Sequence, residues 1–202
     1  MGCDIHCYIE YKRAESEHWS DFGGRINPGR NYWMFGAMAG VRREDLAFID
    51  PRGVPNDIAY HAFNDWTIYV SDDQAEDYKH VDGETYYSKA HASAYVAKGY
   101  CQYFERNGHK DRWVTNSDWH SASWHTSDEF ELAIATYLKA SGFQVGALRL
   151  NGPSEASKLS VLPGTDAGYA LSCITEYWAI LAAMRCFEMQ GHKARLVFWF
   201  DN

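Results

Sequence analysis

The segment CDIHCYIE, residues 3–10, alternates apolar with polar side chains at every position. An alternation with a period of two is typical of a β-strand that packs one face on a core. The opposite face then either lies in solvent or brings polar side chains into a site. The expected apolar face consists of Cys3, Ile5, Cys7 and Ile9. The expected polar face consists of Asp4, His6, Tyr8 and Glu10.

The end of the chain, ARLVFWFDN at 194–202, predicts a second strand. Residues 196–200 are apolar without interruption, as expected of a strand that is covered on both faces. If the two terminal strands pair, Asp4 and Asp201 lie at the same edge of one sheet.

Helical patterns fill much of the chain between these strands. The most regular one covers about 127–141, where Thr126 and Glu129 have the spacing of a capping box. A longer helix is expected at about 169–190, and a short helix is expected after Asn31, a candidate N-cap.

Strands at both ends and helices between them predict an α+β fold with a single domain over 1–202. We expect a mixed sheet that includes the N- and C-terminal strands and is packed by the two longer helices. The acidic, weakly periodic stretch at about 71–112 is a possible surface insertion. The segment NSDWHSASWHT, 116–126, is expected to be a loop.

Composition narrows the possible partners. A formal net charge of −8 opposes binding to duplex nucleic acid, which depends on Lys and Arg. The chain has no apolar run long enough to span a membrane, and five cysteines without C-x-x-C spacing suit reduced thiols. We therefore expect a cytoplasmic protein without a membrane partner.

Two D-x-H pairs suggest a metal site. The carboxylate and imidazole lie on one face of an extended segment in DIH (Asp4, His6) and in DWH (Asp118, His120). Together the four side chains suit a divalent transition metal, zinc or manganese, with room for an activated water. The alternative is that Asp4 and His6 face solvent and that Asp118 caps a turn.

The segment HSASWHT, 120–126, gathers several reactive side chains just before a predicted helix. His125 is expected to serve as acid or base in metal-assisted hydrolysis. In the alternative, Ser121 or Ser123 is the nucleophile and His120 or His125 is its base. No G-x-S-x-G elbow and no orienting acid accompany them. Ser121, Ser123 and Trp124 are also expected to contact the substrate.

Two arginines in loops are candidates for binding an anionic small molecule. Arg30 precedes Asn31, which we place in the same substrate site, and Arg52 lies in the proline-rich PRGVPND loop. Arginine matches phosphate and carboxylate geometry best among the cationic side chains. The alternative for Arg52 is an ion pair with Asp57 that fixes the loop.

Five blocks of the sequence carry a resemblance: MGCDIH, RNYWMFGAMAGVR, PRGVP, HSASW and RLVFWFDN. They resemble a group of small bacterial and bacteriophage proteins with no assigned activity. This resemblance implies a phage or accessory-genome setting and the cytoplasm of a bacterial host cell. DIH is also similar to the first metal motif of calcineurin-like phosphoesterases. The chain lacks the G-D-x-x-D, G-N-H-[DE] and G-H-x-H motifs of that family, so the likeness implies only metal-assisted hydrolysis.

These patterns favour a small metal-assisted hydrolase that acts on a phosphorylated or nucleotide-like small molecule. The alternative is a non-catalytic phage or bacterial binding protein that sequesters a nucleotide signal or a host protein. A structural or assembly protein is the third possibility.

Overall fold

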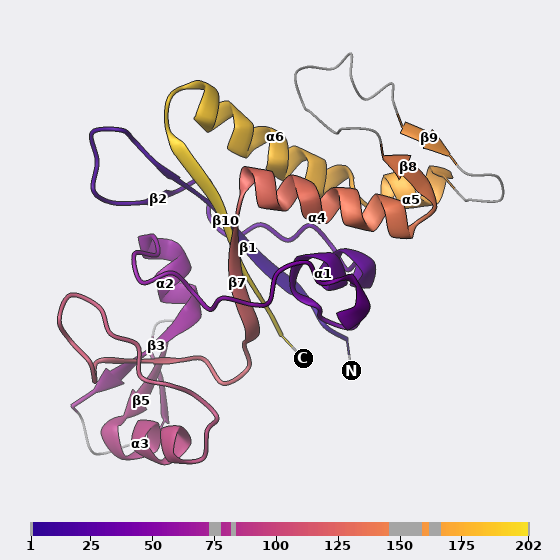
Figure 1. Ribbon diagram of the computed structural model, residues 1–202. Helices are drawn as coiled ribbons and strands as arrows, with labels where there is room; N and C mark the ends of the chain where they lie inside the picture. Colours follow the sequence, from indigo (N-terminus) through magenta and orange to yellow (C-terminus); the bar gives the residue numbers. More distant parts are fainter. Residues whose placement is uncertain (1, 73–77, 82–83, 146–158, 162–166, 202) are drawn as a thin grey trace.

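The computed structural model describes residues 2–72, 78–81, 84–145, 159–161 and 167–201. Its centre is a four-stranded antiparallel sheet in the order β2-β1-β10-β7 (Figure 1). Strands β1 and β10 pair from Ile5 opposite Phe200 to Lys12 opposite Lys193, which confirms that the two ends of the chain share one sheet. The bounds are β1 Ile5–Lys12, β2 Ser20–Asp21, β7 His120–Thr126 and β10 Lys193–Phe200.

One face of this sheet packs against helices, with α4 and α6 side by side and α1 next to them (Figure 1). The alternate residues of β1 that were expected to be apolar, Cys3 through Ile9, are buried there. Short strands β8 and β9 and helix α5 extend the helical layer. The bounds are α1 Tyr32–Ala39, α4 Ser127–Ala140, β8 Phe143–Val145, β9 Leu159–Val161, α5 Ala167–Ser172 and α6 Thr175–Met189.

The helix ends follow local sequence signals. Asn31 accepts hydrogen bonds from two backbone N–H groups of α1, and Thr126 and Glu129 form the capping box of α4. The helix expected at about 169–190 is instead divided into α5 and α6. Ser172 donates its hydroxyl to the carbonyl of Tyr169, a local bond that competes with helical pairing where α5 ends.

The other face of the sheet is not solvated. Tyr8 is 4% exposed and Glu10 is completely buried, because a second layer that includes Ile58, Phe63 and Trp66 covers them. The interpretation of the alternating polar residues as a solvent-facing row is therefore wrong. The β1 pattern identified two different faces, and both are covered.

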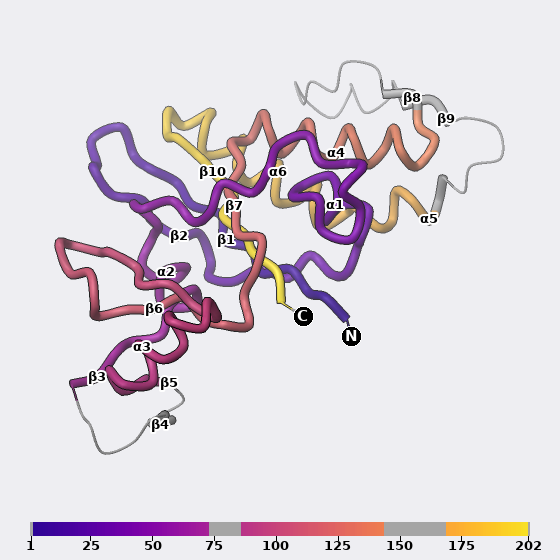
Figure 2. The backbone as a smooth tube through the Cα atoms, turned by 60° about the horizontal axis from the view of Figure 1, so that its bottom comes forward, coloured from indigo at the N-terminus to yellow at the C-terminus, as the bar shows by residue number. Residues whose placement is uncertain are grey.

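Figure 2 shows α2, α3 and β3 together, away from helices α4 and α6. This second layer contains a smaller mixed sheet in the order β4-β5-β3-β6, where β3 and β5 run parallel. Parallel pairing among the described strands is confined to this sheet. Strands β3 and β6 flank residues 71–112, β4 and β5 lie within that range, and all four join this sheet. The interpretation of 71–112 as a surface insertion stays a prediction. The bounds are η1 Glu44–Leu46, α2 Tyr60–Trp66, β3 Thr67–Ser71, β4 Tyr78–Val81, β5 Glu84–Ser88, α3 Lys89–Ala97 and β6 Trp113–Thr115.

The segment HSASWHT was expected to be a loop and is strand β7, paired with β10. Its serines and histidines do not resemble a strand in isolation, but the apolar β10 provides a complete row of backbone partners. The register shifts between Phe198 and Phe200, opposite the start of β7. This bulge lies where the predicted reactive side chains begin.

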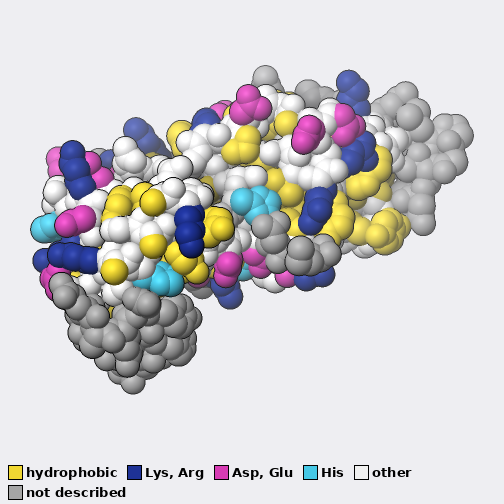
Figure 3. Space-filling view, turned by 90° about the horizontal axis from the view of Figure 1, so that it is seen from below, with side chains coloured by type: hydrophobic (Ala, Val, Ile, Leu, Met, Phe, Trp, Pro, Cys, Tyr) yellow, Lys and Arg dark blue, Asp and Glu magenta, His cyan; other side chains and the backbone are white. Residues whose placement is uncertain are grey.

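The surface seen in Figure 3 mixes charges of both signs, with hydrophobic side chains between them. Over the described part of the chain, no helix has both the length and the apolar character needed to cross a bilayer.

Candidate functional site

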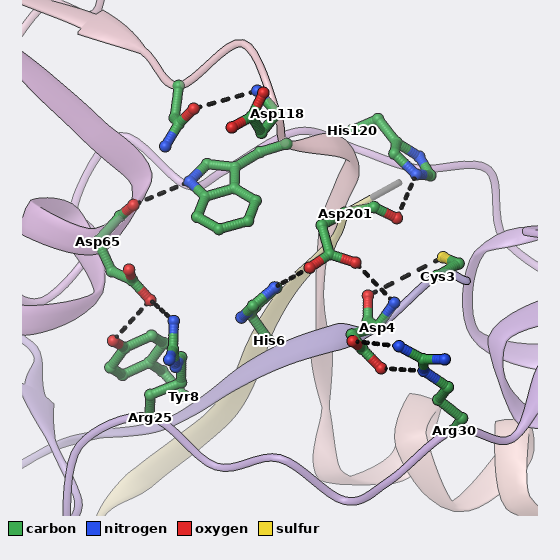
Figure 4. A network of polar contacts seen from close by, with 12 residues as sticks. Cys3, Asp4, His6, Tyr8, Arg25, Arg30, Asp65, Asp118, His120 and Asp201 are labelled. Atoms are coloured by element: carbon green, nitrogen blue, oxygen red, sulfur yellow. Dashed lines mark hydrogen bonds and ion pairs between the residues drawn. The ribbon is translucent and has the colours of Figure 1, made fainter. Parts of the chain in front are cut away.

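Asp201, the residue after β10, gathers polar groups from both ends of the chain (Figure 4). Its carboxylate accepts a hydrogen bond from His6 Nε2 at 3.1 Å and another from the backbone N–H of Asp4 at 2.7 Å. Its own N–H donates to the carbonyl of Asp4 at 3.2 Å. The predicted proximity of Asp4 and Asp201 is thereby confirmed, and it results from the β1–β10 register.

His120 reaches the same residue from β7. Its Nε2 lies 3.2 Å from the backbone carbonyl oxygen of Asp201, and its Nδ1 lies 3.0 Å from Ser121 Oγ. A carbonyl oxygen can only accept, so Nε2 must carry the proton. In the neutral imidazole, Nδ1 is then the acceptor and Ser121 is the donor. This arrangement polarises the Ser121 hydroxyl toward a fixed base.

Backbone strain is concentrated beside this pair. Ser121 has φ 49° and Arg42 has φ 63°, both in the left-handed region that disfavours side chains. The β7–β10 bulge accounts for the conformation of Ser121, since bulges bend a strand and reorient its side chains. Strained non-glycine residues of this kind are enriched at functional sites.

His120, Ser121 and Arg42 line one cavity of about 520 Å³. Arg42 makes no ion pair with any described carboxylate, and its guanidinium lies 5.9 Å from the ring centre of Tyr32. Two carboxylates, Glu44 and Asp50, also line the cavity. The site therefore combines a polarised hydroxyl with one guanidinium that has no ion pair in the described structure, beside two carboxylates.

The buried thiol of Cys3 lies close to this guanidinium. Burial raises the pKa of Cys3, and the neighbouring Arg42 opposes that shift. A thiol that is held protonated is a poor nucleophile. Ser121 is thus better placed than Cys3 to act as a nucleophile.

The four predicted metal ligands do not converge. Asp4 is engaged by Arg30 through both carboxylate oxygens, and the pKa of Asp4 is lowered chiefly by that hydrogen bonding. Asp118 lies apart from Asp201 in Figure 4 and is exposed. Within the described ranges, no group of three or more His, Cys, Asp or Glu side chains is arranged to hold an ion. The residues present do not fit the expected zinc or manganese centre in this conformation.

The alternative role for Asp118 also needs correction. Asn116, rather than Asp118, caps the turn: its Oδ1 accepts the backbone N–H of Asp118 at 3.1 Å. His6 is not solvent-facing either, because the ring of Trp119 lies 4.5 Å from it and Asp201 binds its Nε2.

The three residues expected to bind an anionic molecule from loops have internal partners instead. Arg30 binds Asp4, and Asn31 both caps α1 and donates Nδ2–H to the carbonyl of Cys173 at 3.1 Å. Arg52 forms a two-point pair with Glu129 at 2.9 and 3.0 Å, so the alternative pairing with Asp57 is wrong. These contacts give the three residues structural roles.

Ser123 and Trp124 support the Arg52 loop. Ser123 is buried, and its hydroxyl oxygen accepts the backbone N–H of Arg52 at 3.2 Å. The guanidinium of Arg52 stacks over the Trp124 ring at 3.9 Å. Neither residue lines the cavity of Ser121.

His125 is completely buried on the helical face, between the rings of Phe48 and Phe198. Burial lowers the pKa of His125 to about 4, so the ring is neutral near pH 7. An enclosed imidazole cannot exchange protons with a substrate. Its expected role as catalytic acid or base is therefore not supported by its position.

Sequence reasoning missed two important residues. Asp201 was placed near Asp4 but given no role, although its position directly after a buried terminal strand was visible. Arg42 follows the α1 stop at Gly40, and nothing in the sequence signalled its left-handed backbone. No family model, curated protein or solved structure matches the chain.

Proposed function

We propose that the protein is a hydrolase in which Ser121 is the nucleophile and His120 is the base. The observation that carries this proposal is the 3.0 Å contact between Ser121 Oγ and His120 Nδ1, with the Asp201 carbonyl fixing the proton on Nε2. Asp201 is the positioning residue, since its own carboxylate is anchored by His6 and Asp4.

The reaction class is ester hydrolysis through an acyl-serine. Ser121 Oγ attacks the carbonyl carbon while its proton passes to Nδ1 of His120. The protonated imidazole then gives that proton to the leaving alkoxide, and the C–O bond breaks. Water, deprotonated by His120, attacks the acyl-serine and releases the acid and the free hydroxyl of Ser121.

Charge in the cavity limits the substrate. Arg42 is available for one anionic group, whereas Glu44 and Asp50 repel a molecule with several negative charges. This favours a small ester with a single anionic group over a nucleoside polyphosphate. The metal-assisted route stays a prediction that would require Asp4 to exchange Arg30 for an ion.

The test uses 4-nitrophenyl hemisuccinate, 4-nitrophenyl acetate and 4-nitrophenyl phosphate with the wild-type protein and three variants. His120→Ala should lower kcat/KM by a factor on the order of 10² or more, and Ser121→Ala by at least as much. Arg42→Gln should affect the hemisuccinate more than the acetate. Ser20→Ala, an exposed serine on β2, is the matched control.

Three results would separate the alternatives. An acyl adduct located on Ser121 by mass spectrometry, formed equally with and without a chelator, supports the serine route. Turnover lost on chelation would favour the metal-assisted route. Bound probe recovered intact, with no product from any ester, would leave a binding protein.

A further inference from the structure

The largest of the described cavities is not the one that contains Ser121. It measures about 770 Å³, within the range of small-molecule sites, and lies between the loop before α2 and the hairpin at 103–109. The aromatic side chains on its wall include Trp19, Tyr60, Tyr103 and Phe104. Tyr60 is 63% exposed and Tyr103 is 40% exposed, so two rings are available to a ligand.

Arg106 is the cation on this wall, and a tight hairpin fixes its backbone. Arg106 and His109 exchange two backbone hydrogen bonds of 3.0 Å, and Asn107 and Gly108 between them both have positive φ. An Asn-Gly pair with this conformation is typical of a type I′ turn. The side chain thus projects from a defined position, and its guanidinium lies 3.9 Å over the ring of Phe63.

Arg106 forms no direct ion pair in the described part of the chain, and the Asp21 and Glu10 carboxylates favour its charge only from a greater distance. Its Nη1 atom is buried without a hydrogen-bond partner there, and no carboxylate lies within ion-pair distance. Burial lowers the pKa of Arg106, as expected of a partly desolvated cation. Buried charges in proteins are normally paired, because an unpaired one loses hydration without compensation.

Two of the three carboxylates in the cavity wall, Asp57 and Glu105, have partners other than Arg106. Asp57 binds Arg195 at 2.7 Å and Trp19 Nε1 at 2.8 Å. Glu105 lies 3.6 Å from Lys110. Glu17 is exposed, and its charge adds to the local acidity that disfavours polyanionic ligands.

We propose that this cavity binds a flat aromatic ring that carries one phosphate monoester, with the phosphate on Arg106 and the ring against the exposed tyrosines. Guanidinium groups bind phosphate through charge-assisted hydrogen bonds, and planar rings stack on aromatic side chains. A nucleoside monophosphate and a simple aryl phosphate share this chemistry. The site is separate from Ser121 and does not depend on the proposed hydrolysis.

Titration calorimetry with adenosine 5′-monophosphate and 1-naphthyl phosphate tests the proposal, with adenosine, 1-naphthol and inorganic phosphate as partial probes. At least one aromatic phosphate should bind more than tenfold tighter than its uncharged counterpart and than inorganic phosphate. Arg106→Gln should remove that advantage, and Tyr103→Ala should weaken both the charged and the uncharged probe. Tighter binding of the nucleotide or of the naphthyl phosphate tells the two ligand sources apart.

Lys98→Gln is the charge-matched control, because Lys98 is an exposed cation just after α3 and does not line the cavity. It should leave the affinities unchanged. Equal binding of the charged and uncharged probes by the wild-type protein would overturn the proposal. An equal loss of affinity in Arg106→Gln and in the control variant would also overturn it.

Discussion

Two polar clusters lie toward opposite ends of the β1–β10 ladder, and they differ in how completely the surrounding protein encloses them. At one end, Glu10 pairs with Arg195 across the strands, and the two residues are 0% and 4% exposed. At the other end, Asp201 contacts His120, and His120 and Ser121 border an open cavity. Two non-glycine residues of its wall, Arg42 and Ser121, have a left-handed backbone. We call these the closed end and the open end.

The closed end satisfies its own charges. Glu10 accepts from Arg195 Nε at 2.7 Å and from the backbone N–H of Ala59 at 2.8 Å, while Arg195 also binds Asp57. These bonds attach the 57–59 segment to the sheet. At the open end, by contrast, Arg42 lacks an ion pair in the described structure and Ser121 is strained. Polar residues support the fold at one end and border a cavity at the other.

The largest expected effect comes from breaking the closed end. Arg195→Met leaves the buried Glu10 carboxylate without its cation, which should lower the free energy of unfolding by about 3–5 kcal/mol at pH 8. Urea denaturation followed by tryptophan fluorescence measures the change. Lys193→Met, an exposed position on the same strand, is the control and should change little.

A loss below 1 kcal/mol would show that Glu10 and Arg195 do not stabilise the fold as a pair. The loss should also be smaller at pH 5, where Glu10 can neutralise itself by binding a proton. If the loss were larger at pH 5 than at pH 8, the assigned protonation of Glu10 would be wrong.

The next prediction concerns pH. Burial raises the pKa of Glu10 to about 7, against the opposing effects of Arg195 and the Ala59 N–H, while nearby Asp21 adds to the rise. Between its ordinary value of 4.5 and about 7, the folded state therefore binds more protons than the unfolded state. Stability due to Glu10 must fall as pH rises through this window, by at most about 1.4 kcal/mol per pH unit.

His125 acts in the opposite direction. Its pKa is lowered from 6.5 to about 4, so its contribution to stability rises with pH across that interval and is lost in acid. The two slopes partly cancel in the wild-type protein. Glu10→Gln should therefore show a steeper rise of stability between pH 5 and 6.5 than the wild type does, and His125→Phe should show a fall. Parallel pH profiles in all three proteins would contradict both assignments.

The sequence predicted features that depend on neighbours along the chain. The alternation in β1, the Asn31 cap and the Thr126–Glu129 box each rest on contacts within a few residues, and all are confirmed. The candidate site depends on contacts between distant residues. Arg30 reaches Asp4, and Asp201 reaches both His6 and His120, only after the terminal strands have paired.

Two residues show why the remaining predictions failed. The left-handed backbone of Ser121 lies where the β7–β10 register shifts. This segment was expected to be a loop, and a loop has no strand register from which the shift could be predicted. His125 was judged by its reactive type, yet its position in β7 directs it into the helical core. Alternation would not have separated them even in a recognised strand, because residues 121 and 125 share one face of a regular strand. The bulge between Phe198 and Phe200 is what gives Ser121 a different environment.

A smaller effect is expected at the closed end of β7. Thr126 lies opposite Arg195 in the ladder and caps α4 through its side-chain oxygen. Thr126→Ala should reduce the free energy of unfolding by about 1 kcal/mol, because the first turn loses its hydrogen-bond acceptor. Thr126→Ser keeps that acceptor and should restore most of the loss in the same urea titration. If both variants unfold at the wild-type midpoint, the capping box does not contribute to stability.

The smallest effect separates strain from chemistry at the open end. Ser121→Ala and Ser121→Gly both remove the hydroxyl, but only glycine adopts a φ of 49° without steric cost. Glycine should therefore leave the folded protein more stable than alanine by roughly 0.5–1 kcal/mol, after the entropy that glycine gains in the unfolded chain is subtracted. Ser123 has no positive φ, so the same pair of substitutions there should favour alanine. Urea midpoints for the four variants give the comparison directly. If alanine were the more stable at both positions, the left-handed backbone of Ser121 would not be a strained element, and the contrast between the closed and the open end would rest on burial alone.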